Sequence, residues 1–177
     1  MRNHRQIPVN ARRTLTAGIA GRAVVVASMA AFAMTMPATA APREVGVWYD
    51  DTGKGAVEIF QCGGKLCGRI FWLKDPLNKK GEPLSDGYNP KAELRNRPIC
   101  GLQVLGNLQR QDDGTWDAGW VYDPKVGQSY DAALMISGRN NLILTGYKGL
   151  KFLSKSFTWT RAPQDLPSCS ATTSASR

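Results

Sequence analysis

Residues 57–76 read VEIFQCGGKLCGRIFWLKDP, and the expected architecture follows outward from this stretch. Two apolar runs flank the turn-forming pair Gly63-Gly64, and Cys62 and Cys67 stand on either side of that pair. This pattern is typical of an antiparallel β-hairpin. We predict that the two cysteines form a structural disulfide that staples the neck of the hairpin. A redox pair is the weaker reading, because the Cys-x-x-Cys spacing that lowers a thiolate pKa is absent.

A basic and then apolar leader precedes this domain. Five arginines and no acidic residue lie before the apolar run 23–36, and Pro37 then precedes Ala38-Thr39-Ala40. This order is typical of a secretory signal peptide, which we assign to residues 1–40. The apolar run is shorter than the roughly 20 residues of a membrane anchor, so we expect no stable membrane insertion. The pair Arg12-Arg13 leaves the twin-arginine export route open as an alternative. We expect the mature protein to be periplasmic or secreted.

Charge and histidine content exclude several classes of function. The formal net charge is +9, but the arginines of the leader account for most of the excess over an ordinary surface. We therefore expect no nucleic-acid partner. The one histidine, His4, lies in the leader. The mature chain thus lacks Ser-His-Asp and Cys-His nucleophile systems and any imidazole metal site. We predict no catalytic residues, no metal and no cofactor.

Short apolar runs separated by turn residues continue to the end of the domain. The expected strands are 45–49, 56–61, 66–73, 99–108, 116–122, 128–136, 141–147 and 152–160. Eight such strands predict an all-β fold, an antiparallel up-and-down barrel over residues 41–162, with a sandwich as the alternative. A long proline-rich loop, 75–98, follows the third strand, and the polar segment 163–177 is expected to be a disordered tail.

The ends of the domain carry a pattern that favours closure of the barrel. Trp48 lies in the first strand, and Arg161 ends the last one. If these strands are neighbours, the guanidinium of Arg161 covers the Trp48 ring in a cation–π contact. This arrangement resembles the calycin signature, in which a Gly-x-Trp in the first strand meets a terminal arginine.

Many short motifs occur in an order that resembles domain of unknown function family 2147. They span residues 46–48, 59–73, 75–77, 89–90, 94–99, 101–102, 116–124, 127–130 and 158–161. The resemblance implies an exported bacterial protein with a lipocalin-like, calycin-like β-barrel and no established activity. Many members carry Leu-Cys-Arg where this chain has Leu153-Ser154-Lys155. The partner of Cys100 therefore stays open between Cys169 and a free thiol.

Strand alternation identifies the candidate ligand-binding residues. Trp72 shares a predicted face with Leu66, Gly68 and Ile70, and Trp120 and Tyr122 share one with Trp116 and Ala118. We predict that the walls of a barrel cavity are formed by Trp72, Trp120, Tyr122 and Tyr130, with Arg69 as a polar anchor. The alternative for each aromatic residue is simple core packing, and for Arg69 an outward-facing position.

The most favoured function is an exported, non-catalytic binding protein for a small apolar or amphipathic molecule. The alternative is an envelope protein-interaction module, such as an inhibitor or accessory factor of a cell-wall enzyme, with the 75–98 loop as its contact surface. A carboxylate-only hydrolase is the least supported, because Asp50-Asp51 and Asp112-Asp113 both lie in predicted turns.

Overall fold

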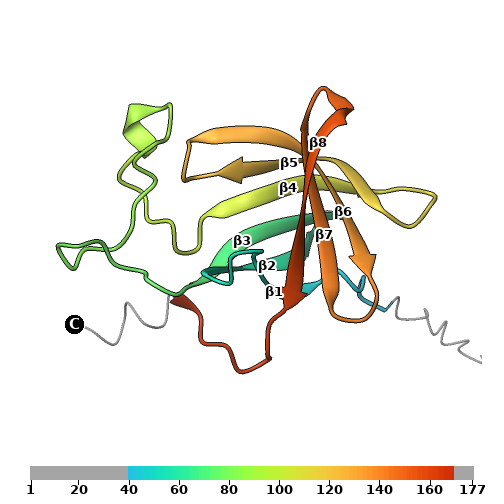
Figure 1. The fold of residues 1–177 in the computed structure, drawn as a ribbon, viewed down its shortest axis with the longest axis horizontal. Helices are drawn as coiled ribbons and strands as arrows, with labels where there is room; N and C mark the ends of the chain where they lie inside the picture. The colour runs from blue at the N-terminus through green and yellow to red at the C-terminus, as the bar shows by residue number, and fades with distance from the viewer. Residues whose placement is uncertain (1–39, 170–177) are drawn as a thin grey trace, which may run out of the picture. The chain divides into compact units, whose positions relative to one another are not determined.

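The computed structural model describes residues 40–169, which form a single ring of antiparallel strands (Figure 1). The expected signal peptide lies outside the described residues, apart from Ala40. The elements are β1 (Gly46–Tyr49), β2 (Gly55–Cys62), β3 (Lys65–Leu73), the 3-10 helix η1 (Ala92–Leu94), β4 (Gln103–Arg110), β5 (Trp116–Asp123), β6 (Gln128–Ser137), β7 (Asn141–Lys148) and β8 (Leu150–Arg161).

Each strand pairs with the next one along the chain, and the ring closes where β1 meets β8. The closing register joins Trp48 to Arg161 and Tyr49 to Thr160. Closure removes the free edges that an open eight-stranded sheet would expose. The up-and-down barrel is therefore confirmed, and the sandwich is excluded. Within residues 40–169, no helix has the length and apolarity that a membrane span requires.

Arg161 locks this closure. Its Cζ lies 4.0 Å from the centroid of the Trp48 ring, and its two terminal nitrogens donate to the carbonyl oxygens of Val45 and Arg43. Gly46 is required below it, since an added Cβ would lie 2.6 Å from Nη1 of Arg161 and φ is +134°. The Gly-x-Trp and the terminal arginine thus form one packing unit, as the sequence predicts.

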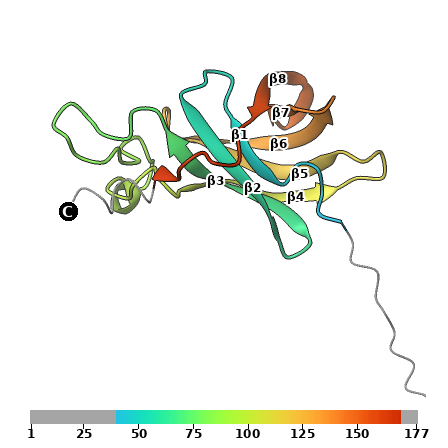
Figure 2. The same cartoon turned by 90° about the horizontal axis from the view of Figure 1, so that it is seen from below.

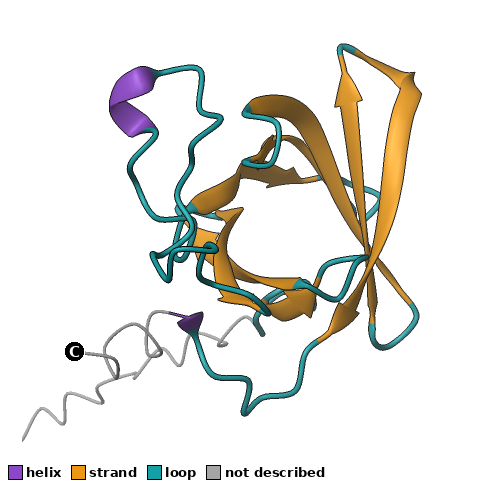
Figure 3. Cartoon of the chain, turned by 60° about the vertical axis from the view of Figure 1, so that its left-hand side comes forward, coloured by secondary structure: helices purple, strands orange, loops and turns teal. Residues whose placement is uncertain are grey.

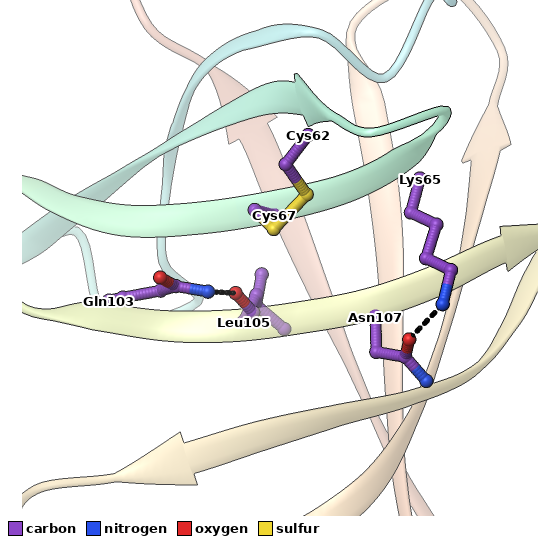
Figure 4. Close-up of a disulfide and its surroundings, with 6 residues drawn as sticks. All are labelled: Cys62, Lys65, Cys67, Gln103, Leu105 and Asn107. Carbon is purple, nitrogen blue, oxygen red and sulfur yellow. Dashed lines mark hydrogen bonds between the residues drawn. A yellow bond between two sulfur atoms is a disulfide. The ribbon is translucent and has the colours of Figure 1, made fainter.

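Two disulfides cross-link the described residues, one between neighbouring strands and one between the long loop and the C-terminal segment. Cys62 bonds to Cys67 across the β2–β3 turn, which confirms the predicted staple (Figure 4). Cys100, at the end of the long loop, bonds to Cys169. Residues 162–169 therefore run across the side of the barrel that carries β1 to β3, up to a buried cysteine (Figure 2). We expected the tail to be disordered from residue 163, and its remaining part, 170–177, lies outside the described residues.

The long loop between β3 and β4 is held against the outside of the barrel by a buried carboxylate. Asp86 is fully buried and accepts hydrogen bonds from the Tyr122 hydroxyl at 2.6 Å, Asn89 at 2.7 Å and Arg97 at 2.9 Å. Its pKa is lowered: burial raises it, but the hydrogen bonds from Tyr122, Asn89 and Arg97 and the Arg97 charge outweigh burial. The loop is thus anchored despite its length.

Candidate functional site

Large apolar side chains fill one end of the barrel, which we call the closed end. It is the end where β1 begins and β8 finishes. Side chains that are less than 2% exposed come from β1, β2, β3, β4, β6 and β7, and include Trp48, Ile59, Leu66, Leu105, Leu108, Leu134 and Leu142. With Trp116 and Trp159, which are 4% and 6% exposed, they fill the interior of the barrel at this end.

Exposure of the inward-facing side chains rises towards the opposite, open end. Along β6, Leu134 and Ala132 are buried and Tyr130 is half-buried. Along β8, Trp159 is buried, Phe157 is half-buried and Lys155 is exposed. The same gradient occurs along β5, from the buried Trp116 to the half-buried Val121, and along β7, from the buried Leu144 to the half-buried Gly146. The interior is therefore a packed core at one end and an accessible apolar surface at the other.

Gly146 shows which side chains meet inside the open end. A Cβ placed on it would lie 3.9 Å from Cγ1 of Val121 and 4.0 Å from Cβ of Tyr130, which are ordinary van der Waals distances. Val121 pairs with the fully buried Leu105, which places it on the inner face. The glycine on β7 thus leaves a shallow space beside the half-buried walls that β5 and β6 provide.

Two lysines border this apolar surface. The ammonium of Lys148 lies 5.5 Å from the ring centroid of Tyr130, and that of Lys155 lies 4.9 Å from the centroid of Phe157. Both lysines are exposed, and within residues 40–169 neither belongs to an ion pair. The open end, which we call the mouth, is formed by Ile70, Val121, Tyr130, Gly146, Lys148, Lys155 and Phe157.

Of the predicted ligand-binding residues, Tyr130 is the one that lies in the mouth. Arg69 does not anchor a ligand inside the barrel. Its side chain is 53% exposed, it donates to Glu58 at 2.7 Å, and it lies over the Phe60 ring. Arg69 alternates with the inward-facing Gly68 and Ile70, so the outward alternative is the correct one.

Trp72 also lies outside the barrel, because a bulge reverses the alternation of β3. Val57 pairs with Ile70 but Ala56 pairs with Trp72, so Phe71 is an extra residue. After this bulge Trp72 shares the face of Tyr49, whose ring it meets edge to face at a centroid distance of 5.6 Å. The two rings border an open hollow of about 420 Å³ on the outer surface.

A second bulge moves Trp120 and Tyr122 to the outer face. Trp116 faces the core, but Ala118 has φ +55° and the β5–β6 register shifts between Trp116 and Gly119. The four residues that we predicted to share one side are thereby split. Trp120 packs over Gly106, where an added Cβ would lie 2.6 Å from its Cζ2. Tyr122 joins the buried network of the long loop.

Several carboxylates of the described residues have local partners. Asp50, Asp113 and Asp123 accept hydrogen bonds from backbone amides of their own turns. Asp86 pairs with Arg97, and Asp117 with Lys151. Within residues 40–169, no group of three His, Cys, Asp or Glu side chains could hold a metal ion.

Most of the mouth was missed from the sequence. Lys148, Lys155 and Gly146 carry no motif of their own. The alternation of Leu142, Leu144 and Gly146 along β7 could have indicated it. These residues share the inward face of the strand, and Gly146 is the one nearest the open end. The loop anchor Asp86 was missed too, because its partner Tyr122 lies 36 residues away in sequence.

Comparisons with known proteins agree with this architecture. A family described as "Uncharacterized protein conserved in bacteria (DUF2147)" matches residues 46–161. Among solved structures, protein HP1028 from Helicobacter pylori, described as belonging to the lipocalin family, superposes with a TM-score of 0.59. It is 23% identical, and the match covers 69% of this chain and 84% of that one, a likeness that shows the fold. No curated protein matches the chain.

Proposed function

The chain belongs to the DUF2147 family of bacterial proteins, and from its lipocalin-like barrel we propose that it is an exported, non-catalytic binding protein. The ligand that we propose is a small amphipathic anion, with its apolar part in the mouth and its charged group at the rim. The observation that carries this proposal is the gradient inside the barrel, which is packed at the closed end and half-exposed at the mouth.

The mouth offers the two kinds of contact that such a ligand needs. Val121, Ile70 and Phe157 present partly exposed apolar surface next to the core, and burying it against a hydrocarbon chain is favourable. The ammonium groups of Lys148 and Lys155 lie at the edge of that surface and lack carboxylate partners within residues 40–169. A carboxylate or phosphate would form charge-assisted hydrogen bonds with them.

Two further observations support export and a non-catalytic role. All four cysteines of the chain are in disulfides, which form and persist in oxidising compartments. Asp50 and Asp113 serve turns, and Asp86 and Asp117 pair with cations, whereas a hydrolase of this kind uses two carboxylates facing one cleft.

Gly146→Leu tests the site directly. Gly146 has ordinary backbone geometry and an added Cβ fits, so a leucine side chain should occupy the mouth rather than unfold the strand. Native mass spectrometry and titration with dodecanoate should show binding to the natural protein and a loss of affinity of at least about tenfold in the variant. The matched control is Thr158→Leu, which adds the same side chain at an exposed position of β8. Equal affinity in all three proteins would refute the proposal.

The charged rim is tested by the choice of head group. Natural protein should prefer dodecanoate over dodecanol, and Lys148→Met with Lys155→Met should remove that preference while keeping the affinity for the alcohol. A preference that survives in the double variant would show that the lysines do not contact the head group.

A specific observation also favours the interaction-module alternative. Tyr88 is 73% exposed on the long loop, which Asp86 anchors to the barrel two residues away. An exposed tyrosine on an anchored loop is a common interface residue. Loss of a defined envelope partner from Tyr88→Ala, with dodecanoate binding unchanged, would support this function.

A further inference from the structure

The hairpin between β7 and β8 concentrates exposed apolar side chains at its tip. Leu150, Phe152 and Leu153 are 58%, 79% and 69% exposed, whereas the other large exposed apolar residues are scattered over separate elements. Every residue of β8 from Leu150 to Ser156 is exposed. The tip is thus an apolar surface that the barrel itself does not cover.

The tip projects because β8 is much longer than the strand that closes the ring. β8 pairs with β7 from Thr160 to Leu150, but β1 meets it only at Thr160 and Arg161. The first part of β8 therefore lies beyond its pairing with β1, while β7 stays paired with β6 as far as Tyr147, and the tip of the hairpin is visible above the ring in Figure 3.

Three lysines surround the apolar tip. Lys148 and Lys155 border the mouth, and Lys151 lies between Leu150 and Phe152. The acids that face this hairpin are Asp117, which pairs with Lys151, and Asp131, which accepts the amide hydrogen of Gly149. Two of the three cations therefore remain without an ion-pair partner among the described residues.

We propose that this tip docks reversibly on an anionic lipid bilayer. Aromatic and leucine side chains at the end of a projecting hairpin suit the boundary between head groups and acyl chains. Lysines beside them suit the negative potential of such a surface. A flat protein interface would need far more buried area than three side chains supply. The contact is peripheral, so it agrees with the expectation that the mature chain does not insert stably.

Docking would also turn the mouth towards the lipid. Lys148 and Lys155 belong to both surfaces, so a bilayer that contacts the tip lies beside the site proposed for an amphipathic anion. Transfer of a ligand between barrel and bilayer rests on the proposed function. Docking itself does not rest on the proposed function, and docking and ligand binding are measured separately.

Vesicle flotation tests the docking. Protein recovered after export should float with vesicles containing phosphatidylglycerol and stay behind with pure phosphatidylcholine, and added salt should weaken the interaction. Phe152→Ser with Leu153→Ser should reduce the bound fraction by at least about fivefold. Tyr88→Ser, which removes an equally exposed ring elsewhere, should float like the natural protein.

Three results would overturn the docking. One is flotation equal in the tip variant and the natural protein, and another is no flotation with either lipid. The third is self-association of the natural protein in the absence of lipid, if the tip substitutions abolish it. The tip would then be a contact between copies of the chain. Dodecanoate binding and melting temperature, measured on the same tip variant, should match the natural protein. If they do, a failure of docking is distinct from a failure of folding or of the proposed function.

Discussion

Replacing Asp86 with asparagine tests whether a single buried carboxylate holds the long loop to the barrel. The substitution keeps the shape of the side chain and removes its charge. Asp86 has no exposed surface, and it receives the Tyr122 hydroxyl at 2.6 Å, the Asn89 amide at 2.7 Å and Nη2 of Arg97 at 2.8 Å. An amide cannot accept all of these donors, and its own NH₂ needs an acceptor.

The expected loss of stability follows from these contacts. Removing one partner of a buried ion pair costs about 3–5 kcal/mol. The Arg97 side chain is 36% exposed and can regain water, so the cost belongs at the lower end of that range. We expect the free energy of unfolding of Asp86→Asn to fall by about 3 kcal/mol at pH 7.

The pH dependence has a definite sign. The pKa of Asp86 is lower in the folded protein than in the unfolded chain, where it is about 3.9. The folded state therefore favours the charged form, and this stabilisation is present above about pH 4 and lost as pH falls through the folded pKa. The difference between natural protein and variant should shrink below about pH 4.

Urea unfolding at pH 7 and pH 3 measures both quantities, since urea does not screen charges. Asp112→Asn, in an exposed turn, is the matched control and should change stability by less than about 0.5 kcal/mol. A loss below about 1 kcal/mol at pH 7, or the same loss at both pH values, would refute the anchoring role of the charge.

Other consequences of the fold can be measured in the same way. Removing the Cys100–Cys169 disulfide by serine substitution should cost about 4 kcal/mol, because the sequence separation is 69, and should cost more than removing the hairpin disulfide, whose separation is 5; equal losses in urea unfolding would contradict this. Arg161→Met should cost about 2–3 kcal/mol through the lost contact with the Trp48 ring and two carbonyl hydrogen bonds, and Arg161→Lys should restore only part of it in thermal unfolding. Burial and the Asp117 carboxylate raise the pKa of Tyr147 to about 12, so the folded state disfavours ionisation of this tyrosine and stability should fall as pH rises above about 10. An absorbance titration in which Tyr147→Phe keeps the late tyrosine ionisation phase of the natural protein would contradict this.

The elements of the barrel could be predicted because their causes are local. Alternating apolar residues, glycine-containing turns and the Cys62–Cys67 spacing act over a few residues, and they mark each strand where it occurs. Closure was predictable as well, since eight antiparallel strands must manage two edges and Gly46 and Arg161 stand at the two ends. The long loop also follows from its prolines.

The direction of Trp72, Trp120 and Tyr122 could not be predicted, because it depends on two bulges. Phe71 and Ala118 each add one residue to a strand, and beyond each of them the inward and outward faces exchange. Ala118 adopts a positive φ that its residue type does not favour, and the amide of Asn107 on the neighbouring strand donates to its carbonyl oxygen at 3.1 Å. Cross-strand packing sets such a conformation, so Trp72 and Trp120 lie outside.

Contacts between distant parts of the chain were equally beyond local pattern. The Cys100–Cys169 disulfide, the burial of Asp86 against Tyr122 and the meeting of Gly146 with Val121 all depend on how strands curve around the barrel. The sequence by itself determined that this chain forms a closed, disulfide-linked barrel, since periodicity and turns are short-range properties. Only the tertiary structure decided which end is packed and which is open, because that depends on side-chain volumes brought together from different strands.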